Sequence, residues 1–279
     1  MLFASDLDRT LIYSNKFLDN FTIKEHKNVC LIEKKGDKEI SFMTNRAIDK
    51  LKELSQKLCF VPTTTRTIEQ YRRISIFQNE IISKYAVVSN GGNILIDGKV
   101  DKIWNRCIKN KIKNEAVSIA DVLKKFNEIK NKEWLISCNT ADKLFCYCIV
   151  DLSKLKKDEL KSFFKWLDGN NWNVSLQGRK LYFIPNCVNK RDAIVYIANN
   201  AGIKTIAAAG DSYLDLCMLD IADYGVSPFH GEIYDLYKDK KCEDMKLEFT
   251  LSSGILAAEE ILKNIEIFLN NNFMRTALT

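Results

Sequence analysis

The segment Asp6-Leu7-Asp8-Arg9-Thr10-Leu11 places two carboxylates two residues apart, directly after the apolar run Leu2-Phe3-Ala4. The apolar run predicts a buried strand. Because strand side chains alternate between faces, Asp6 and Asp8 should project on the same side. The carboxyl edge of an open α/β sheet is where ligands bind, and like charges held this close shift their pKa values or bind a cation. Taken alone, the pair is equally typical of a solvated turn.

Length and composition are those of an ordinary globular protein with room for about two domains. The chain has 279 residues, of which 46% are hydrophobic and 28% charged. Charged residues interrupt the N-terminus before an apolar signal region forms, and no apolar run approaches the roughly 20 residues of a membrane helix. We therefore expect a cytoplasmic protein that does not associate with membranes.

Charge and metal-binding residue types exclude several functions. The net charge of +6 is modest, and no stacking-aromatic or phosphate-loop motif occurs, so we expect no nucleic-acid partner. None of the nine cysteines forms a Cys-x-x-Cys pair, which favours reduced thiols. Two histidines leave little material for a zinc site or a Ser-His-Asp triad. No obligate protein partner is identifiable.

The first third of the chain alternates strands and helices, which is typical of a parallel sheet. Thr44 can cap one helix, and Thr67 with Gln70 forms a capping box for a second. A hairpin with arms at 29–32 and 39–42 interrupts the alternation. The buried strands are expected at residues 2–4, 58–61 and 85–88.

The middle third has a different order, α-β-β-α-β-β, in which repeated β-β pairs indicate antiparallel pairing and hence a second sheet. Its helices are expected at 119–129 and 155–167, and its strands at 134–138, 144–150, 172–176 and 180–184. The parallel pattern resumes with a helix at 190–201, strands at 204–209 and 224–226, and a helix at 254–269. We predict an α/β fold: a Rossmann-like core of residues 1–104 and 186–279, with an α+β domain inserted at 105–185.

A second acidic pair, Asp211 and Asp215, follows the strand that ends at Ala209. Acids at a helix start often only complement the helix dipole, so the weight comes from joint occurrence with the first pair. Thr64 ends the second core strand, and Lys190 opens a helix of the same core. Several carboxylates without His or Cys favour Mg²⁺, and a hydroxyl and an ammonium beside it suit a phosphoryl group.

These segments resemble the four motifs of the haloacid dehalogenase (HAD) superfamily of phosphohydrolases. The motifs are Asp6-Leu7-Asp8-Arg9-Thr10, Thr64 within Pro62-Thr63-Thr64-Thr65-Arg66, Lys190, and Gly210-Asp211-Ser212-Tyr213-Leu214-Asp215. Relatives commonly read Thr-Gly-Arg in the second motif, which Thr64-Thr65-Arg66 matches with one substitution; Thr63 or Thr65 could replace Thr64 in its role. At Arg9 many relatives carry glycine.

The insert resembles the α/β cap of the Cof-type and sucrose-phosphate-phosphatase-like branch, and Asn90-Gly91-Gly92 resembles the turn that precedes that cap. Three segments look most like the HAD proteins of tellurite-resistance operons. They are the hairpin insert after the first motif, the segment 63–67, and Ser227-Pro228-Phe229-His230-Gly231. The resemblance implies a HAD-like core, with residues 105–185 as the cap that sets specificity.

The resemblance also implies a role for each matched residue. Asp6 would be the nucleophile that forms an aspartyl-phosphate, and Asp8 the general acid and then base. Thr64 and Lys190 would hold the phosphoryl oxygens. Mg²⁺ would lie between Asp6, Asp211 and the backbone carbonyl of Asp8, with Asp215 as a direct or an indirect partner. Further phosphate or substrate contacts are expected from Thr10, Thr65, Arg66, Asn90, Gly91 and Arg179, and Lys180 and Tyr182 are cap candidates that are equally typical of a surface strand.

The predicted function is a Mg²⁺-dependent phosphatase acting on a small, sugar-phosphate-like metabolite. One alternative passes the phosphoryl group to a second substrate hydroxyl, as a mutase or phosphotransferase does. Another is a non-catalytic binding or stress-response module on the same scaffold, against which the filled motif positions argue.

Overall fold

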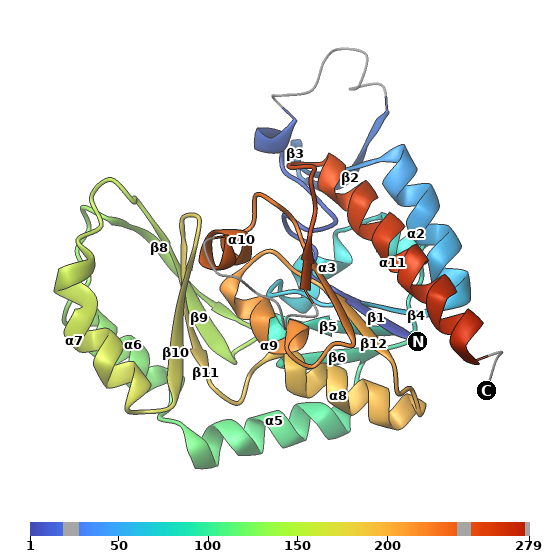
Figure 1. Ribbon diagram of the computed structural model, residues 1–279. Coiled ribbons are helices and arrows are strands. Elements are labelled where there is room, and N and C mark those ends of the chain that lie inside the picture. The colour runs from blue at the N-terminus through green and yellow to red at the C-terminus, as the bar shows by residue number, and fades with distance from the viewer. Residues whose placement is uncertain (19–27, 239–246, 277–279) are drawn as a thin grey trace.

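A five-stranded parallel sheet forms the centre of the molecule in a computed structural model that describes residues 1–18, 28–238 and 247–276 (Figure 1). The strand order is β14-β13-β12-β1-β4, and each neighbouring pair is parallel. The strands are β1 (Leu2–Ser5), β4 (Cys59–Pro62), β12 (Ile206–Ala209), β13 (Tyr224–Ser227) and β14 (Leu247–Phe249). The predicted Rossmann-like core is therefore confirmed, and β1 lies at its centre, between β12 and β4.

Helices cover both faces of this sheet (Figure 1). On one face α2 (Asn45–Lys57) and α11 (Leu256–Thr276) pack over Phe3 and Phe60. On the other, α8 (Lys190–Ala201) and α9 (Leu216–Leu219) pack over Leu2 and Ala4. The alternation of Leu2, Phe3 and Ala4 between two cores is the period of two expected of a strand that is buried on both faces.

The predicted strand at 85–88 exists as β5 (Tyr85–Val88), but it joins the parallel sheet only through one parallel bridge, between Thr63 and Val87. Residues 89–92 turn the chain back at once. As a result β5 pairs along its length with β6 (Asn93–Ile96), and β6 pairs with β7 (Lys99–Val100). The core edge is thus a small antiparallel sheet beside β4.

Local capping chemistry sets the helix boundaries, as predicted for Thr44 and for the Thr67–Gln70 box. Thr44 Oγ1 accepts from the backbone N–H of Ala47 at the start of α2. Thr67 and Gln70 exchange both capping-box bonds at the start of α3 (Ile68–Arg72). Gly202 ends α8 with a positive φ of 66°. The remaining short core helices are α4 (Ile76–Asn79) and α10 (Glu232–Tyr237).

Besides the short helices α4 and α10, helix α5 and strand β14 were not predicted. Helix α5 (Lys102–Glu115) begins at the cap residue Asp101 and buries only Trp104 and Ile108, so its apolar stripe is sparse in sequence. Strand β14 has three residues, none fully buried. The hairpin of β2 (Val29–Lys35) and β3 (Lys38–Thr44) agrees with the prediction.

The inserted segment has the predicted α-β-β-α-β-β order and its own antiparallel sheet, β10-β11-β9-β8, which lies beside the core (Figure 1). Its elements are α6 (Ile119–Asn127), β8 (Leu135–Ala141), β9 (Phe145–Val150), α7 (Lys157–Asp168), β10 (Trp172–Gln177) and β11 (Lys180–Pro185). The rings of Phe126, Phe163 and Phe183 pack between the helices and the sheet, with centroids 5.2–5.6 Å apart. The boundary predicted at residue 105 falls within α5. None of the helices in the described part of the chain combines the length and the apolar character of a membrane span.

Candidate active site

Three buried carboxylates meet at the carboxyl edge of the central sheet. Asp6 follows β1, and Asp211 and Asp215 follow β12; one oxygen of each lies within 4.8 Å of the others. The backbone N–H of Asp6 donates to the carbonyl of Ala209 at 2.8 Å, which joins the two strand ends. A Cβ at Gly210 would lie 2.4 Å from Cβ of Asp215, so only glycine allows this approach.

Lys190 neutralises part of this cluster from the first residue of α8. Its Nζ donates to Asp6 Oδ1 at 2.6 Å and to Asp215 Oδ1 at 2.5 Å, and its side chain is only 1% exposed. The other oxygen of Asp215 accepts from the backbone N–H and the hydroxyl of Ser212. Both oxygens of Asp215 are therefore engaged, whereas Asp6 and Asp211 keep oxygens with long contacts or none.

Residues 90 and 91 fix the start of α8. Asn90 donates from Nδ2 to the carbonyl of Val188 at 3.0 Å. At Gly91, where φ is 94°, a Cβ would lie 2.0 Å from the carbonyl oxygen of Asn189. The structure therefore places Asn90 and Gly91 against the backbone that presents Lys190. Neither residue is among those that line the cavity described below, and their contact with substrate stays a prediction.

Burial makes the acidic cluster electrostatically costly. Burial, together with Asp215 and Asp8, raises the pKa of Asp6 to about 7 although Lys190 opposes the shift. Burial, Asp6 and Asp215 likewise raise the pKa of Asp211 well above its ordinary value. For Lys190, burial would lower the pKa, but Asp215 and Asp6 raise it. The cluster thus holds more negative charge than its one lysine balances.

The donor set fits Mg²⁺. Asp211 Oδ2 is buried and accepts no hydrogen bond from any described residue, although Arg9 Nε lies 3.4 Å away. Such an oxygen, with carboxylates beside it and no His or Cys in the group, suits a hard cation. The carboxylate of Asp8 lies outside this group, so its expected contribution is limited to its backbone carbonyl.

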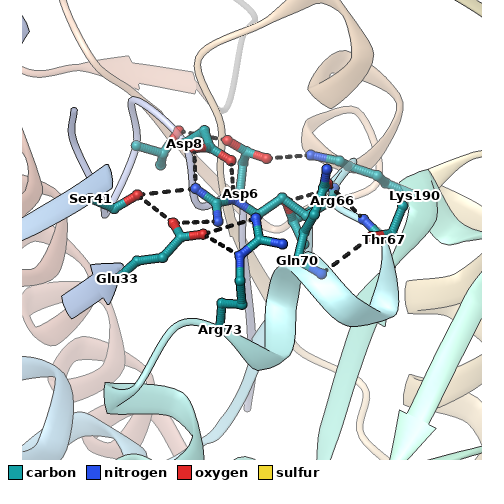
Figure 2. A network of polar contacts seen from close by, with 11 residues as sticks. Asp6, Asp8, Glu33, Ser41, Arg66, Thr67, Gln70, Arg73 and Lys190 are labelled. Atoms are coloured by element: carbon teal, nitrogen blue, oxygen red, sulfur yellow. Dashed lines mark hydrogen bonds and ion pairs between the residues drawn. The ribbon is translucent and has the colours of Figure 1, made fainter. Parts of the chain in front are cut away.

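Asp8 is held instead by Arg66. The guanidinium donates from Nε and Nη2 to the two carboxylate oxygens of Asp8 at 2.7 and 2.8 Å, a bidentate pair (Figure 2). Partial removal of the Asp8 carboxylate from water would raise its pKa, but the charge and hydrogen bonds of Arg66 lower it to about 2. Arg66 Nη1 donates to Glu33 at 2.6 Å. Arg66, predicted to contact substrate, therefore has Nε, Nη1 and Nη2 occupied by protein oxygens.

The threonines of the first two motifs lie around the same edge. Thr64 is fully buried, and its Oγ1 accepts from the backbone N–H of Arg66 at 3.2 Å, which fixes the hydroxyl beside the strand end. Thr65 lines the cavity described below. Thr10 is buried and its hydroxyl lies 3.4 Å from Asp6 Oδ2, a long contact.

A cavity of about 510 Å³ opens between the carboxylates and the inserted domain. Asp6, Asp8 and Asp211 form its floor. The inserted domain covers it with Ile149, Leu176, Gln177, Gly178, Arg179, Lys180 and Tyr182. Gln177 Nε2 donates to Ser212 Oγ at 2.8 Å, and Asp142 accepts from the backbone N–H of Ile68 at 3.0 Å and from the hydroxyl of Ser89. These bonds hold the inserted domain over the carboxylates.

Arg9 departs from glycine in a conformation that glycine favours, with φ at 67°. Its Nη2 donates to the carbonyl of His230 at 2.9 Å, and its guanidinium lies 5.6 Å from the ring centroid of Phe17. His230 Nδ1 accepts from the backbone N–H of Gly254, so its Nε2 carries the proton and donates to the Arg9 carbonyl at 3.0 Å. Sequence analysis assigned no role to His230 or to Glu33; each acts through contacts distant in sequence.

The chain resembles known proteins both in sequence and in fold. Residues 105–227 match the family model of haloacid dehalogenase-like hydrolases. No curated protein matches the chain by sequence. The sucrose-phosphatase of Synechocystis sp. PCC6803, solved with sucrose and phosphate, superposes with a TM-score of 0.69 at 17% identity, covering 96% of this chain and 97% of that one.

Two further structures show the same fold. The HAD subclass IIB sugar phosphatase BT4131 gives a TM-score of 0.62 at 14% identity, covering 96% of this chain and 98% of that chain. A trehalose-6-phosphate phosphatase related protein gives 0.56 at 14% identity, covering 98% and 100%.

Residues 105–227 are thus similar to haloacid dehalogenase-like hydrolases, and the chain as a whole shares the fold of the three solved structures. The superpositions extend over 96–98% of this chain and therefore include the inserted domain with its own antiparallel sheet. The narrower resemblance to proteins of tellurite-resistance operons stays a prediction.

Proposed function

We propose that the protein is a Mg²⁺-dependent phosphatase that hydrolyses a small phosphorylated metabolite through an aspartyl-phosphate on Asp6. The observation that carries the proposal is the buried group of Asp6, Asp211, Asp215 and Lys190 at one strand edge, with Asp8 beside it and a cap above. Asp6, Asp211 and the backbone carbonyl of Asp8 would hold the ion. The ion would neutralise the phosphoryl oxygens and the nucleophile.

In the first half-reaction Asp6 Oδ attacks phosphorus and the bond from phosphorus to the ester oxygen breaks. Because Arg66 keeps Asp8 ionised in the resting site, Asp8 first accepts the proton of the bound monoester, whose second ionisation lies at a pKa of about 6, and then passes it to the departing oxygen. In the second half-reaction Asp8 takes a proton from water and the water oxygen attacks phosphorus. The bond from phosphorus to Asp6 Oδ breaks, and Asp8 gives its proton to the departing inorganic phosphate.

Thr64 and Lys190 would hold the phosphoryl oxygens, and the cap residues Arg179, Lys180 and Tyr182 would contact the rest of the substrate. The cavity of about 510 Å³ accepts a molecule of sugar-phosphate size. The named activities of the sucrose-phosphatase and sugar-phosphatase structures support this substrate class. Closure of the cap would exclude water from the phosphoryl group.

The test is phosphate release from a panel of phosphorylated metabolites with Mg²⁺ or with EDTA, for the wild type and Asp6→Asn. We expect release with Mg²⁺ only, and none from Asp6→Asn. The exposed hairpin-turn variant Asp37→Asn is the matched control. Wild-type turnover by Asp6→Asn would refute the assignment of Asp6 as the nucleophile. If the wild type released phosphate from no substrate of the panel, the proposed phosphatase function would be refuted. Formation of an isomeric phosphate without free phosphate would assign a mutase instead.

A further inference from the structure

The β2–β3 hairpin sends one acidic side chain into the site. Glu33 is fully buried, although the strand around it is half exposed. The β2–β3 ladder shifts register on both sides of Glu33, as a β-bulge does. A bulge re-aims the side chain that it carries. Here Ile32 and Glu33 are both buried although they are consecutive in a strand, so the bulge is what turns the carboxylate inward.

The carboxylate of Glu33 accepts hydrogen bonds from two arginines and one hydroxyl. Its Oε2 accepts from Arg66 Nη1 at 2.6 Å and from Ser41 Oγ at 2.8 Å, and its Oε1 accepts from Arg73 Nε at 3.3 Å (Figure 2). Arg66 Nη2 also donates to Ser41 Oγ at 3.1 Å. The far edge of the Arg66 guanidinium is thus fixed by the hairpin, while its near edge binds Asp8.

We propose that Glu33 is a positioning residue for the reaction: by anchoring Arg66, it fixes the Asp8 carboxylate in the orientation from which Asp8 passes a proton to the ester oxygen. Arg66 alone would be a long side chain with rotational freedom. The hydrogen bonds to Glu33 and Ser41 restrict the guanidinium to one orientation. Proton transfer from Asp8 depends on the position of its carboxylate, which the guanidinium then fixes. The side chain of Asp8 is 47% exposed, so few other contacts restrict it.

This inference rests on the proposed function, and its test uses the leaving group. Departure of an alkoxide, as from a hexose 6-phosphate, needs a proton, whereas p-nitrophenolate leaves without one. The value of kcat/KM covers the steps up to departure of the leaving group, so it excludes the later attack of water. For Glu33→Gln we expect kcat/KM to fall by about 10- to 100-fold on the alkyl phosphate and by less than about 3-fold on p-nitrophenyl phosphate.

The ratio of the two values, measured in one preparation, does not depend on how much of the variant is folded. Ser41→Ala keeps both arginine pairs and should shift the ratio in the same direction by a smaller factor. Glu39→Gln, exposed on the same hairpin, should leave the ratio at the wild-type value. Equal losses on both substrates for Glu33→Gln would overturn the positioning role. A wild type without activity on either substrate would instead overturn the proposed function.

Discussion

Replacing Asp6 by Asn should make the metal-free protein more stable while it abolishes turnover. The nucleophile is buried among like charges, so its ionised form is disfavoured and its pKa rises from 3.8 to about 7. A carboxyl group whose folded pKa is raised binds more protons in the folded state than in the unfolded state between those two values. Its destabilising effect is therefore small near pH 4, grows as pH rises, and is complete above pH 7.

The size of the effect follows from the shift. A rise of roughly three pKa units corresponds to ~4 kcal/mol of unfavourable free energy for the ionised group. Asn removes that penalty, and the opposing attraction of Lys190 is already included in it. Lys190 keeps its second partner, Asp215. We therefore expect Asp6→Asn to raise the free energy of unfolding by up to about 4 kcal/mol at pH 8, and to change it little or unfavourably at pH 4.5.

Urea unfolding followed by far-UV circular dichroism in EDTA measures this difference at both pH values. Saturating Mg²⁺ should stabilise the wild type, by about 2.7 kcal/mol at one hundred times the dissociation constant, and the variant by less, so the advantage of the variant shrinks. Asp37→Asn is the exposed control and should show neither effect. A variant less stable than the wild type at pH 8 in EDTA would refute the argument, because the ion pair with Lys190 would then outweigh the burial of Asp6.

Three further perturbations follow from the same contacts. Lys190→Met leaves three buried carboxylates without their ammonium. Urea unfolding in EDTA at pH 8 should show that the free energy of unfolding falls by about 3–5 kcal/mol, and Mg²⁺ should partly restore it. An unchanged unfolding midpoint would contradict the burial argument. Asp142→Ala removes the acceptor that ties the cap to Ile68, so steady-state kinetics should show KM rising more than kcat falls, and an equal change in both would assign it no role in cap placement. Burial lowers the pKa of His230 to about 4, so unfolding free energy should rise with pH between about 4 and 6.5, by about 1–2 kcal/mol after allowance for its partial exposure; His230→Gln should flatten this rise, and an unaltered pH profile would assign it to other groups.

Signals that lie within a few residues of one another predicted most of the fold. Thr44 and the Thr67–Gln70 box mark helix starts because the capping atoms are three residues from the N–H groups that they accept from. The order of elements then determined that the middle segment has its own sheet. Strand β14 and helix α5 were not predicted because the hydrophobic periodicity of both segments is weak. The strand is too short, and the helix buries only two side chains.

The candidate site also has features that local sequence predicts and features that depend on long-range contacts. The strand-end rule brought Asp6 and Asp211 together in prediction, because both follow strands of one parallel sheet. The contacts that orient the site join segments far apart in the chain, such as Arg66 with Asp8 and Glu33 with Arg66. A buried glutamate in a bulged strand has no short-range signature, since the bulge itself arises from pairing with β3 and the approach of Ile74. The roles of the site residues stay predictions until variants are measured.

Arg9 shows how a departure from a common motif can be accommodated structurally. A non-glycine residue in the left-handed region costs about 1–2 kcal/mol. Three contacts oppose that cost: the Arg9 Nη2 bond to the His230 carbonyl, the return bond from His230 Nε2 to the Arg9 carbonyl, and the packing of the guanidinium over Phe17. Because hydrogen bonds of this kind contribute about 0.5–1.5 kcal/mol each, the loop at His230 can offset the strain at position 9. The first motif and that loop therefore form one structural unit, which places a cation beside Asp211 at the floor of the cavity.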